Sequence, residues 1–540
     1  MIDLERFLTW GLCIFLTMLS GFGILWSGVF WLPFTLFGLA SLLGLYDVTQ
    51  KRHAILRNYP VLGHMRFIFE GVRPEIRQYL IESDQDEEPF SRDDRSLVYQ
   101  RAKGVEDKRP FGTRERVYDS GYQWLTHSIQ PVSHASHDFR VMIGGPDCTQ
   151  PYNASIYNIS AMSFGSLSAN AISALNRGAK AGGFAHDTGE GGISRYHREG
   201  GGDLIYEVGS GYFGCRNPDG SFSPEKFAEQ AANPQVKMVE LKLSQGAKPG
   251  LGGMLPASKI SPEIAEARGI PMGQDCLSPA SHSAFSTPIE LLQFIARMRE
   301  LAAGKPTGFK LCVGHRREFM CLVKAMLESG ITPDFIVVDG KEGGTGAAPL
   351  EFSNHMGMPL VEGLTFVHNT LRGAGLRDRI KLGASGKLIT SFDIARALAL
   401  GADWVNSARG FMFAVGCIQA QACHTNHCPV GVATQDKLRQ RALDVPSKAE
   451  RVARFHNNTL EALAKMTGAA GLTHPGNFLP HHLLMRENDR MMVNGQAVYP
   501  YLPEGFLLRG ESNGFGYLAR WERADAKSFA PPEGMGPGIV

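Results

Sequence analysis

The sequence predicts an α/β protein, a (β/α)8 TIM barrel that follows two apolar helices at the N-terminus. Short apolar runs alternate with amphipathic helical stretches over about 280 residues, which is the length that such a barrel needs. Ahead of them, residues 7–46 contain no Asp, Glu, Lys or Arg. A doubly wound sheet is the alternative, although no Gly-x-Gly-x-x-Gly follows a strand as a dinucleotide-binding fold requires.

The apolar segment at residues 7–46 is too long for one membrane span or for a signal peptide. Its forty residues would form a helix of about 60 Å, twice the hydrocarbon thickness of about 30 Å. We therefore expect a hairpin of two spans joined near Gly28, with a buried helix pair of a soluble protein as the alternative. Lys51 and Arg52 follow the run, so the positive-inside rule predicts a catalytic domain on the cytoplasmic side of the inner (cytoplasmic) membrane.

Pattern and composition suggest four regions along the chain. We expect the transmembrane hairpin at 1–48, a connecting region packed on the barrel at 49–149, the barrel at 150–470 and a C-terminal extension at 471–540. Within the barrel the expected strands are residues 157–162, 236–243, 308–313, 334–339, 380–383 and 403–406, and the expected helices are 169–181, 289–301, 318–329 and 391–400.

Charge and cysteine content exclude two classes of protein. Lys plus Arg number 55 and Asp plus Glu number 53, a balance that argues against a nucleic-acid surface. The nine cysteines are odd in number and mostly scattered, which is not a disulfide framework, so we expect a reducing compartment.

Three of the cysteines fall within twelve residues, at Cys417, Cys423 and Cys428, and Pro429 follows the last one. Three thiolates suit an iron–sulfur cluster, most naturally 3Fe–4S, better than zinc, which would need a fourth ligand. The alternative is that they are buried reduced cysteines in a helix.

Polar residues gather where barrel strands are expected to end, which is where barrels place their chemistry. Glu190 lies in a glycine-rich loop, and Lys242, Gln245 and Lys248 follow a strand at spacings of three. Two ammonium groups and an amide suit a small dicarboxylate, with an exposed basic loop as the alternative.

A lysine and several glycine-rich loops complete the pattern. Lys310 lies inside a strand, where it either points into a polar barrel mouth or is costly to bury. Backbone that passes close to a ligand is expected in the loop made by Gly343, Gly344, Thr345 and Gly346. Gly386, Ser407 and Arg409 end the last two strands, where barrels commonly hold a phosphate.

These motifs together resemble the FMN-binding synthase domain of glutamate synthases. The resemblance rests on five segments in the family's order, at residues 159–168, 188–192, 242–250, 343–347 and 416–435. It implies a (β/α)8 barrel that carries FMN and one 3Fe–4S cluster.

The resemblance also implies roles for single residues. The cluster ligands would be Cys417, Cys423 and Cys428, the residues for 2-oxoglutarate would be Lys242, Gln245, Lys248 and Arg268, and Glu190 would be the active-site carboxylate. Lys310 would lie near the N1–O2 edge of the flavin, backbone contacts to it would come from Met162, Ser163 and residues 343–346, and its phosphate would be held near Gly386, Ser407 and Arg409. The chain departs from the family pattern at Asp187 and at residues 339–342, both near the flavin.

The implied reaction is reductive amination of 2-oxoglutarate to glutamate, with electrons that pass from a donor through the cluster to FMN. We expect a stand-alone form without the glutaminase domain and the C-terminal β-helix of that family, and without a nicotinamide-binding motif of its own. We therefore expect ammonia or an amine from solution or from a separate glutaminase subunit, and a separate electron-donor protein or a quinone. The alternatives are synthesis of an N-substituted glutamate, oxidation of an amino acid into the quinone pool, and a non-catalytic membrane subunit that relays electrons.

Overall fold

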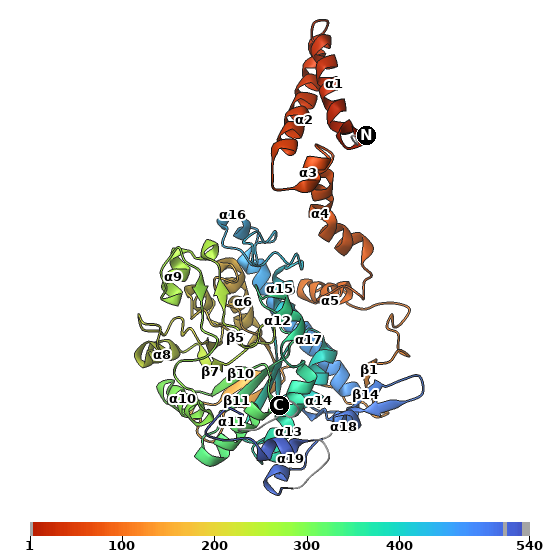
Figure 1. The fold of residues 1–540 in the computed structure, drawn as a ribbon. Coiled ribbons are helices and arrows are strands. Elements are labelled where there is room, and N and C mark those ends of the chain that lie inside the picture. The colour runs from red at the N-terminus through yellow and green to blue at the C-terminus, as the bar shows by residue number, and fades with distance from the viewer. Residues whose placement is uncertain (1–3, 500, 511–515, 532–540) are drawn as a thin grey trace. The chain divides into compact units, whose positions relative to one another are not determined.

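The computed structural model describes residues 4–499, 501–510 and 516–531, and it divides the chain into two compact units (Figure 1). The first unit is Met1–Asp93 and the second is Asp94–Val540. The four predicted regions stay predictions, and residues 511–515 and 532–540 of the expected C-terminal extension lie outside the described residues.

The first unit begins with the two expected apolar helices, α1 (Leu8–Gly23) and α2 (Trp31–Thr49), joined by the short helix η2 (Gly28–Phe30). The helices pack closely, since the indole Nε1 of Trp10 donates to the Ser41 carbonyl at 2.9 Å. Both helical stretches, Glu5–Gly23 and Gly28–Thr49, have the length and composition needed to cross a membrane. The predicted helix pair with its junction near Gly28 is therefore confirmed.

The rest of the first unit contains helices that the sequence analysis did not assign. They are α3 (Ala54–Asn58), α4 (His64–Ile76) and a continuing π-helical turn, η3 (Arg77–Ile81). The helix α5 (Arg92–Lys103) follows and runs into the second unit.

Eight parallel strands close into a barrel in the second unit, which confirms the predicted fold and excludes the doubly wound sheet. In chain order they are β4 (Tyr157–Ile159), β5 (His186–Asp187), β6 (Leu204–Val208), β7 (Val236–Lys242), β10 (Thr307–Leu311), β11 (Phe335–Asp339), β12 (Lys381–Ser385) and β13 (Trp404–Ser407). The sheet closes where Val405 of β13 pairs with Tyr157 of β4. Sequence analysis found six of the eight strands. It missed β5, which has only two residues, and β6, because a carboxylate interrupts the apolar run of that strand.

The predicted barrel helices correspond to α6 (Ala169–Gly182), α10 (Pro288–Leu301), α11 (Arg316–Ser329) and α14 (Ser391–Ala399). Local sequence explains their limits. For example, the Ser168 hydroxyl accepts the Ala171 N–H at the start of α6, and Gly183 ends this helix in the left-handed conformation. The sequence analysis missed α13 (Leu360–Gly373) and the long helix α17 (Val445–Ala469), which packs against α6.

A hairpin of β2 (Arg140–Ile143) and β3 (Tyr152–Ser155) closes the barrel at the N-terminal ends of its strands. The amide of Gly145 in this hairpin donates to the Asp334 carboxylate, just ahead of β11, at 2.7 Å. The hairpin also contributes to a core cluster of Ile143, Ala154, Ala185, Ile205, Met238, Phe335, Val337 and Trp404. Because this end is filled with apolar side chains, the C-terminal ends of the strands are left for chemistry.

A segment that precedes the barrel strands in the chain and a segment that follows them form one small sheet. The strand β1 (Gln123–Leu125) pairs with β14 (Leu483–Arg486), which pairs with β15 (Met492–Asn494). The other elements are α7 (Arg195–Arg198), α8 (Pro224–Ala231), β8 (Met254–Leu255), α9 (Pro262–Arg268), β9 (Cys276–Leu277), α12 (Leu350–His355), α15 (Arg409–Val415), α16 (Lys437–Gln440), α18 (Gly495–Val498) and α19 (Tyr517–Glu522).

Candidate active site at the barrel mouth

Two groups of charged side chains lie on the barrel strands and on the segments that follow them. We call Glu190, Lys242, Lys248 and Arg268 the mouth cluster, and Asp187, Glu207, Glu240 and Lys310 the acidic cluster. They meet along β7, where Glu240 and Lys242 are two residues apart and therefore share a face. Lys242 is also the register partner of Lys310 on β10.

The mouth cluster brings together four residues that the sequence analysis named. The ammonium Nζ of Lys242 lies 3.2 Å from Oε2 of Glu190. Lys248 and Arg268 are both buried, with 5% and 4% of their surfaces exposed. Arg268 is held by Phe213, whose ring centroid lies 5.3 Å from the guanidinium carbon. The lysine loop is thus not the exposed basic loop considered as the alternative.

Electrostatics in the mouth cluster favour a bound anion. Burial acts to raise the pKa of Glu190, but the charges of Lys242, Arg268 and Lys248 outweigh it and lower this pKa below its ordinary value. Burial lowers the pKa of Lys248, and the nearby Glu190 carboxylate opposes that shift. Three cations face one carboxylate, so an anionic ligand would relieve the repulsion among them.

Glycines make room for the Glu190 carboxylate. A Cβ on Gly209, just after β6, would lie 2.7 Å from Oε2 of Glu190. A Cβ on Gly253, in the loop after Lys248, would overlap the other carboxylate oxygen. The glycine-rich character of these loops is therefore needed for close packing around this carboxylate. Gln245, also predicted for the site, lies half-buried in the same loop.

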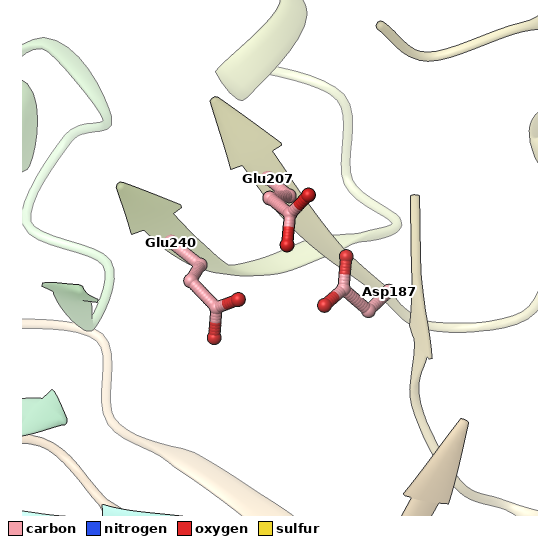
Figure 2. A group of neighbouring side chains, drawn as sticks. All are labelled: Asp187, Glu207 and Glu240. Carbon is pink, nitrogen blue, oxygen red and sulfur yellow. The ribbon is translucent and has the colours of Figure 1, made fainter. Parts of the chain in front are cut away.

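The acidic cluster lies inside the barrel, where three carboxylates converge (Figure 2). The Lys310 ammonium donates to Glu207, and it lies 3.2 Å from Oε1 of Glu240 and 3.9 Å from Oδ2 of Asp187. All four side chains are buried. Because Lys310 supplies a cation for these carboxylates, the group forms an ionic cluster.

Burial sets the protonation of the acidic cluster. Burial, together with the neighbouring Glu207, raises the pKa of Asp187 well above its ordinary value. Burial likewise raises the pKa of Glu240 to about 7, against the opposing effect of Lys310. Burial alone would lower the pKa of Lys310, but the carboxylates outweigh it and raise this pKa. The ammonium therefore stays charged, and the cluster holds protons near neutral pH.

Sequence reasoning missed Glu207 and Glu240 as members of the site. The signal was present, because each is a single carboxylate within an apolar strand, as in Leu204–Val208. A charge at such a position is costly to bury unless a partner lies opposite it. Lys310 was named, and its partners are these carboxylates.

Three segments predicted to contact FMN, one at the flavin and two at its phosphate, converge at the ends of β11, β12 and β13. Arg409 donates to the Glu342 carbonyl, and a Cβ on Gly344 would lie 2.8 Å from Nε of Arg409. Gly386 has a φ of +135°, and a Cβ there would lie 3.4 Å from the Gly340 amide nitrogen. Ser407 is buried at the end of β13. These positions therefore form one glycine-lined region beside a guanidinium group.

The departures from the family pattern at residues 339–342 have structural roles. The Asp339 carboxylate accepts the Ser385 hydroxyl and, at 2.6 Å, the Gly246 amide, so it fixes the loops after β12 and β7. The Glu342 carboxylate accepts the Leu360 N–H at 2.9 Å, at the start of α13. Asp339 thus stabilises the loops at the barrel mouth, and Glu342 stabilises the start of α13.

Met162 and Ser163, also predicted to contact the flavin, lie in the loop after β4. The Met162 amide donates to the Asp187 carbonyl at 3.0 Å. A Cβ on Gly189 would lie 2.8 Å from the Ser163 amide nitrogen. This loop therefore packs on the one that carries Glu190.

The three clustered cysteines follow α15 in a loop with no helix, so the alternative of cysteines in a helix is wrong. The backbone is left-handed at Gln419, Gln421 and Asn426, which folds the loop back on itself. Burial raises the pKa of Cys417 to about 12, and the nearby thiols of Cys423 and Cys428 add to this shift.

Two polar side chains hold the cysteine loop in place. The Lys259 ammonium donates to the Cys423 carbonyl at 3.2 Å and to the Ser166 carbonyl at 3.0 Å. The Tyr99 hydroxyl donates to the Cys417 carbonyl at 2.6 Å. Sequence analysis named neither Lys259 nor Tyr99, and no motif marks them.

Comparison with known proteins agrees with this geometry. The family described as the conserved region in glutamate synthase matches residues 149–473. The chain is 39% identical over 508 residues to the glutamate synthase large subunit-like protein YerD of Bacillus subtilis, with 86% of this chain and 96% of that one covered. It is 36% identical to the archaeal-type glutamate synthase [NADPH] of Thermotoga neapolitana, and the match covers 58% of each chain.

Among solved structures, flavocytochrome b2 with bound pyruvate resembles the chain at a TM-score of 0.40 and 14% identity, over 78% of this chain and 88% of that one. The family match covers more than half of the chain and includes the barrel, the mouth cluster and the cysteine loop. The chain therefore belongs to the glutamate synthase family and is an oxidoreductase of that family.

Proposed function

We propose that this protein catalyses reductive amination of 2-oxoglutarate to glutamate, with FMN and a 3Fe–4S cluster as its cofactors. The observation that carries the proposal is the mouth cluster, in which the buried Lys248 and Arg268 and the partly buried Lys242 face one carboxylate. An excess of two positive charges at the end of a barrel matches the two carboxylates of 2-oxoglutarate. The family to which the chain belongs supports the reaction type.

In this proposal the cations of the mouth cluster position the substrate. Lys242, Lys248 and Arg268 hold the substrate carboxylates and fix the 2-imino acid in one orientation. Glu190 has a lowered pKa, so it is ionised near neutral pH. An ionised carboxylate accepts a hydrogen bond from the imine N–H and stabilises positive charge on that nitrogen.

The glycine-lined region at the ends of β11, β12 and β13 fits a flavin phosphate. Its loops are rich in glycine, and the Arg409 guanidinium group lies beside Gly344. Residues 343–346, Gly386 and Ser407 would hold FMN together with the loop at Met162 and Ser163. Bound FMN would supply the hydride for the substrate carbon. Lys310 would stay charged beside it because of its carboxylates.

The cysteine loop fits a cluster with three thiolate ligands. Cys417, Cys423 and Cys428 lie within twelve residues on one folded loop rather than along a helix. Such a cluster would supply one-electron transfer from an external donor, either a separate protein or a quinone. Lys259 and Tyr99 would hold the loop by their bonds to its carbonyls.

We also propose that α1 and α2 span the cytoplasmic membrane as a hairpin. Both stretches have suitable length and hydropathy, and only 17% and 6% of their most apolar windows are buried. Helices that pack inside a soluble core would be mostly buried. Extraction of membranes with alkaline carbonate tests the anchor, because a spanning hairpin stays in the membrane and a peripheral protein is washed off.

Anaerobic titration of the purified full chain tests the reaction. The protein, with its flavin and cluster verified by absorption and EPR spectra, is reduced and mixed with 2-oxoglutarate and ammonia. We expect flavin reoxidation and formation of glutamate. If neither occurs, the substrate assignment is wrong, and flavin reduction by glutamate followed by quinone-dependent reoxidation would instead favour amino-acid oxidation. Turnover that persists in Lys248→Ala at the rate of the surface control Lys180→Ala would favour a pure electron relay.

A further inference from the structure

The helix α4 and its continuation η3 carry an apolar stripe that the proposed function does not use. Apolar residues recur at spacings of three and four on one face, at Met65, Ile68, Phe69, Val72, Ile76, Tyr79 and Leu80. Much of this stripe is exposed, with 62% of Ile68, 59% of Phe69 and 79% of Leu80 accessible. An exposed apolar stripe of this length marks a surface that contacts another apolar phase.

A buried carboxylate fastens α4 to the end of α2. Asp47 lies in the last turn of α2 and is fully buried. One of its oxygens lies 2.8 Å from Nε2 of His64, the first residue of α4, and the other accepts the Val61 N–H at 2.9 Å. The amphipathic helix therefore begins at the level where the second apolar helix ends.

Resting on the proposed membrane hairpin, we propose that α4 and η3 lie in the surface of the phospholipid bilayer, with the apolar stripe inserted at the boundary between headgroups and acyl chains. A helix with one apolar face and one charged face binds a bilayer in this way when its length runs along the interface. The hairpin places the start of α4 at that boundary, and the Asp47 contacts keep it there.

The charges beside the stripe suit phospholipid headgroups. Residues 48–82 contain six Lys and Arg against three Glu, an excess of three positive charges. Arg66, Arg73 and Arg77 recur on one flank of the helix, and with Phe69, Glu70, Ile76 and Ile81 they line a cavity of about 590 Å³. Arg66 pairs with Glu70 at 2.9 Å and Arg77 pairs with Glu82, so these guanidinium groups already lie in a polar strip beside the apolar stripe. Guanidinium groups beside apolar side chains match a lipid phosphate above its acyl chains.

Two other occupants would also cover the stripe, namely the barrel of the same chain and a second copy of the chain. A photoreactive residue on the stripe distinguishes the bilayer, the barrel and a second copy of the chain as the surface that covers it. We would place p-benzoylphenylalanine at Phe69, on the stripe, in the full-length protein in nanodiscs of phosphatidylcholine and phosphatidylglycerol. The matched control has the same residue at Gly71, on another face, where a Cβ would have no heavy atom within 4 Å.

After irradiation we expect a phospholipid adduct on most of the Phe69 probe and on little of the Gly71 probe, read by mass spectrometry of the peptide. Addition of Asp47→Ala should reduce the lipid adduct at Phe69, because α4 is then released from α2. Adducts to barrel peptides or to a second chain, or the absence of a lipid adduct at Phe69, would overturn the proposal. Retention of the same protein after alkaline carbonate extraction shows separately that the hairpin is anchored, so failure of the surface helix and failure of the anchor are distinguishable.

Discussion

The mouth cluster and the acidic cluster meet along β7 but are unbalanced in opposite senses. In the mouth cluster three cations surround Glu190, and in the acidic cluster three carboxylates surround Lys310. The acidic cluster is buried, and in the mouth cluster only 10% of the Lys242 side chain and 19% of the Glu190 side chain are exposed, so bulk water screens neither imbalance strongly. The same strand contributes to both, through Glu240 and Lys242.

The excess charge of the two clusters is neutralised in different ways. The acidic cluster takes up protons, because burial raises the pKa values of Asp187 and Glu240. The mouth cluster has no comparable internal remedy, since an arginine stays protonated and Lys248 has no carboxylate within ion-pair distance in the described part of the chain. A cluster that protons can neutralise stabilises the fold, whereas a cluster that needs an external anion is suited to binding a substrate.

The largest expected effect is a loss of protein stability when the acidic cluster loses its cation. Lys310→Met leaves three buried carboxylates without a cation and should lower the free energy of unfolding by roughly 3–5 kcal/mol. The loss should be smaller at pH 5 than at pH 8, because protonation of the acids replaces the ammonium. Urea denaturation of the full chain in detergent measures it. The matched control is Lys242→Met, which removes one cation from the mouth cluster, where cations are in excess. An equal loss of unfolding free energy in both variants would refute the difference between the two clusters.

A smaller effect is expected on substrate affinity in the mouth cluster. Lys248→Met removes a charged donor and should weaken 2-oxoglutarate binding by about 10- to 100-fold, the equivalent of one hydrogen bond to a charged group. Unfolding should be nearly unchanged, because this lysine is buried without an ion-pair partner among the described residues. Isothermal titration calorimetry gives the affinity, with Lys180→Met as a surface control. Unchanged affinity would show that the loop does not bind the substrate.

The smallest effect over a single pH unit is on the pH dependence of stability. The folded-state pKa of Glu240 is raised from 4.5 to about 7, so the native state holds a proton that the unfolded state releases. Its stabilising contribution is full below about pH 4.5 and is lost as the pH rises to about 7. Glu240→Gln should remove this slope, which is at most about 1.4 kcal/mol per pH unit.

Glu190→Gln provides the contrast for that experiment. The pKa of Glu190 is lowered, so its contribution is present above the unfolded-state pKa and is lost as the pH falls through the folded-state pKa. Glu190→Gln should therefore change how the free energy of unfolding depends on pH only at acidic pH, at and below the ordinary glutamate pKa of 4.5. A change between pH 5 and 7 in Glu190→Gln, or none there in Glu240→Gln, would contradict the assignment of the two clusters.

Local sequence was enough to predict the elements whose pattern is strong. Apolar runs located strands such as β7 and β11, and a stretch without charges located the helix pair at residues 7–46. The strand β5 was missed because two residues give no period, and α4 was missed because the segment was interpreted only by its polarity. Lys242 and Lys248 were predicted as binding residues because lysines in a glycine-rich loop after a strand have a recognisable pattern.

By itself the sequence determined the fold class, the apolar hairpin, the cysteine loop and the candidates for the barrel mouth, because periodicity and local spacing are properties of neighbouring residues. Only the tertiary structure decided which charges face one another. Asp187, Glu207, Glu240 and Lys310 are up to 123 residues apart in the chain, and closure of the barrel brings them together. Burial then sets their protonation, because removal from water is a property of the whole fold and no single segment encodes it.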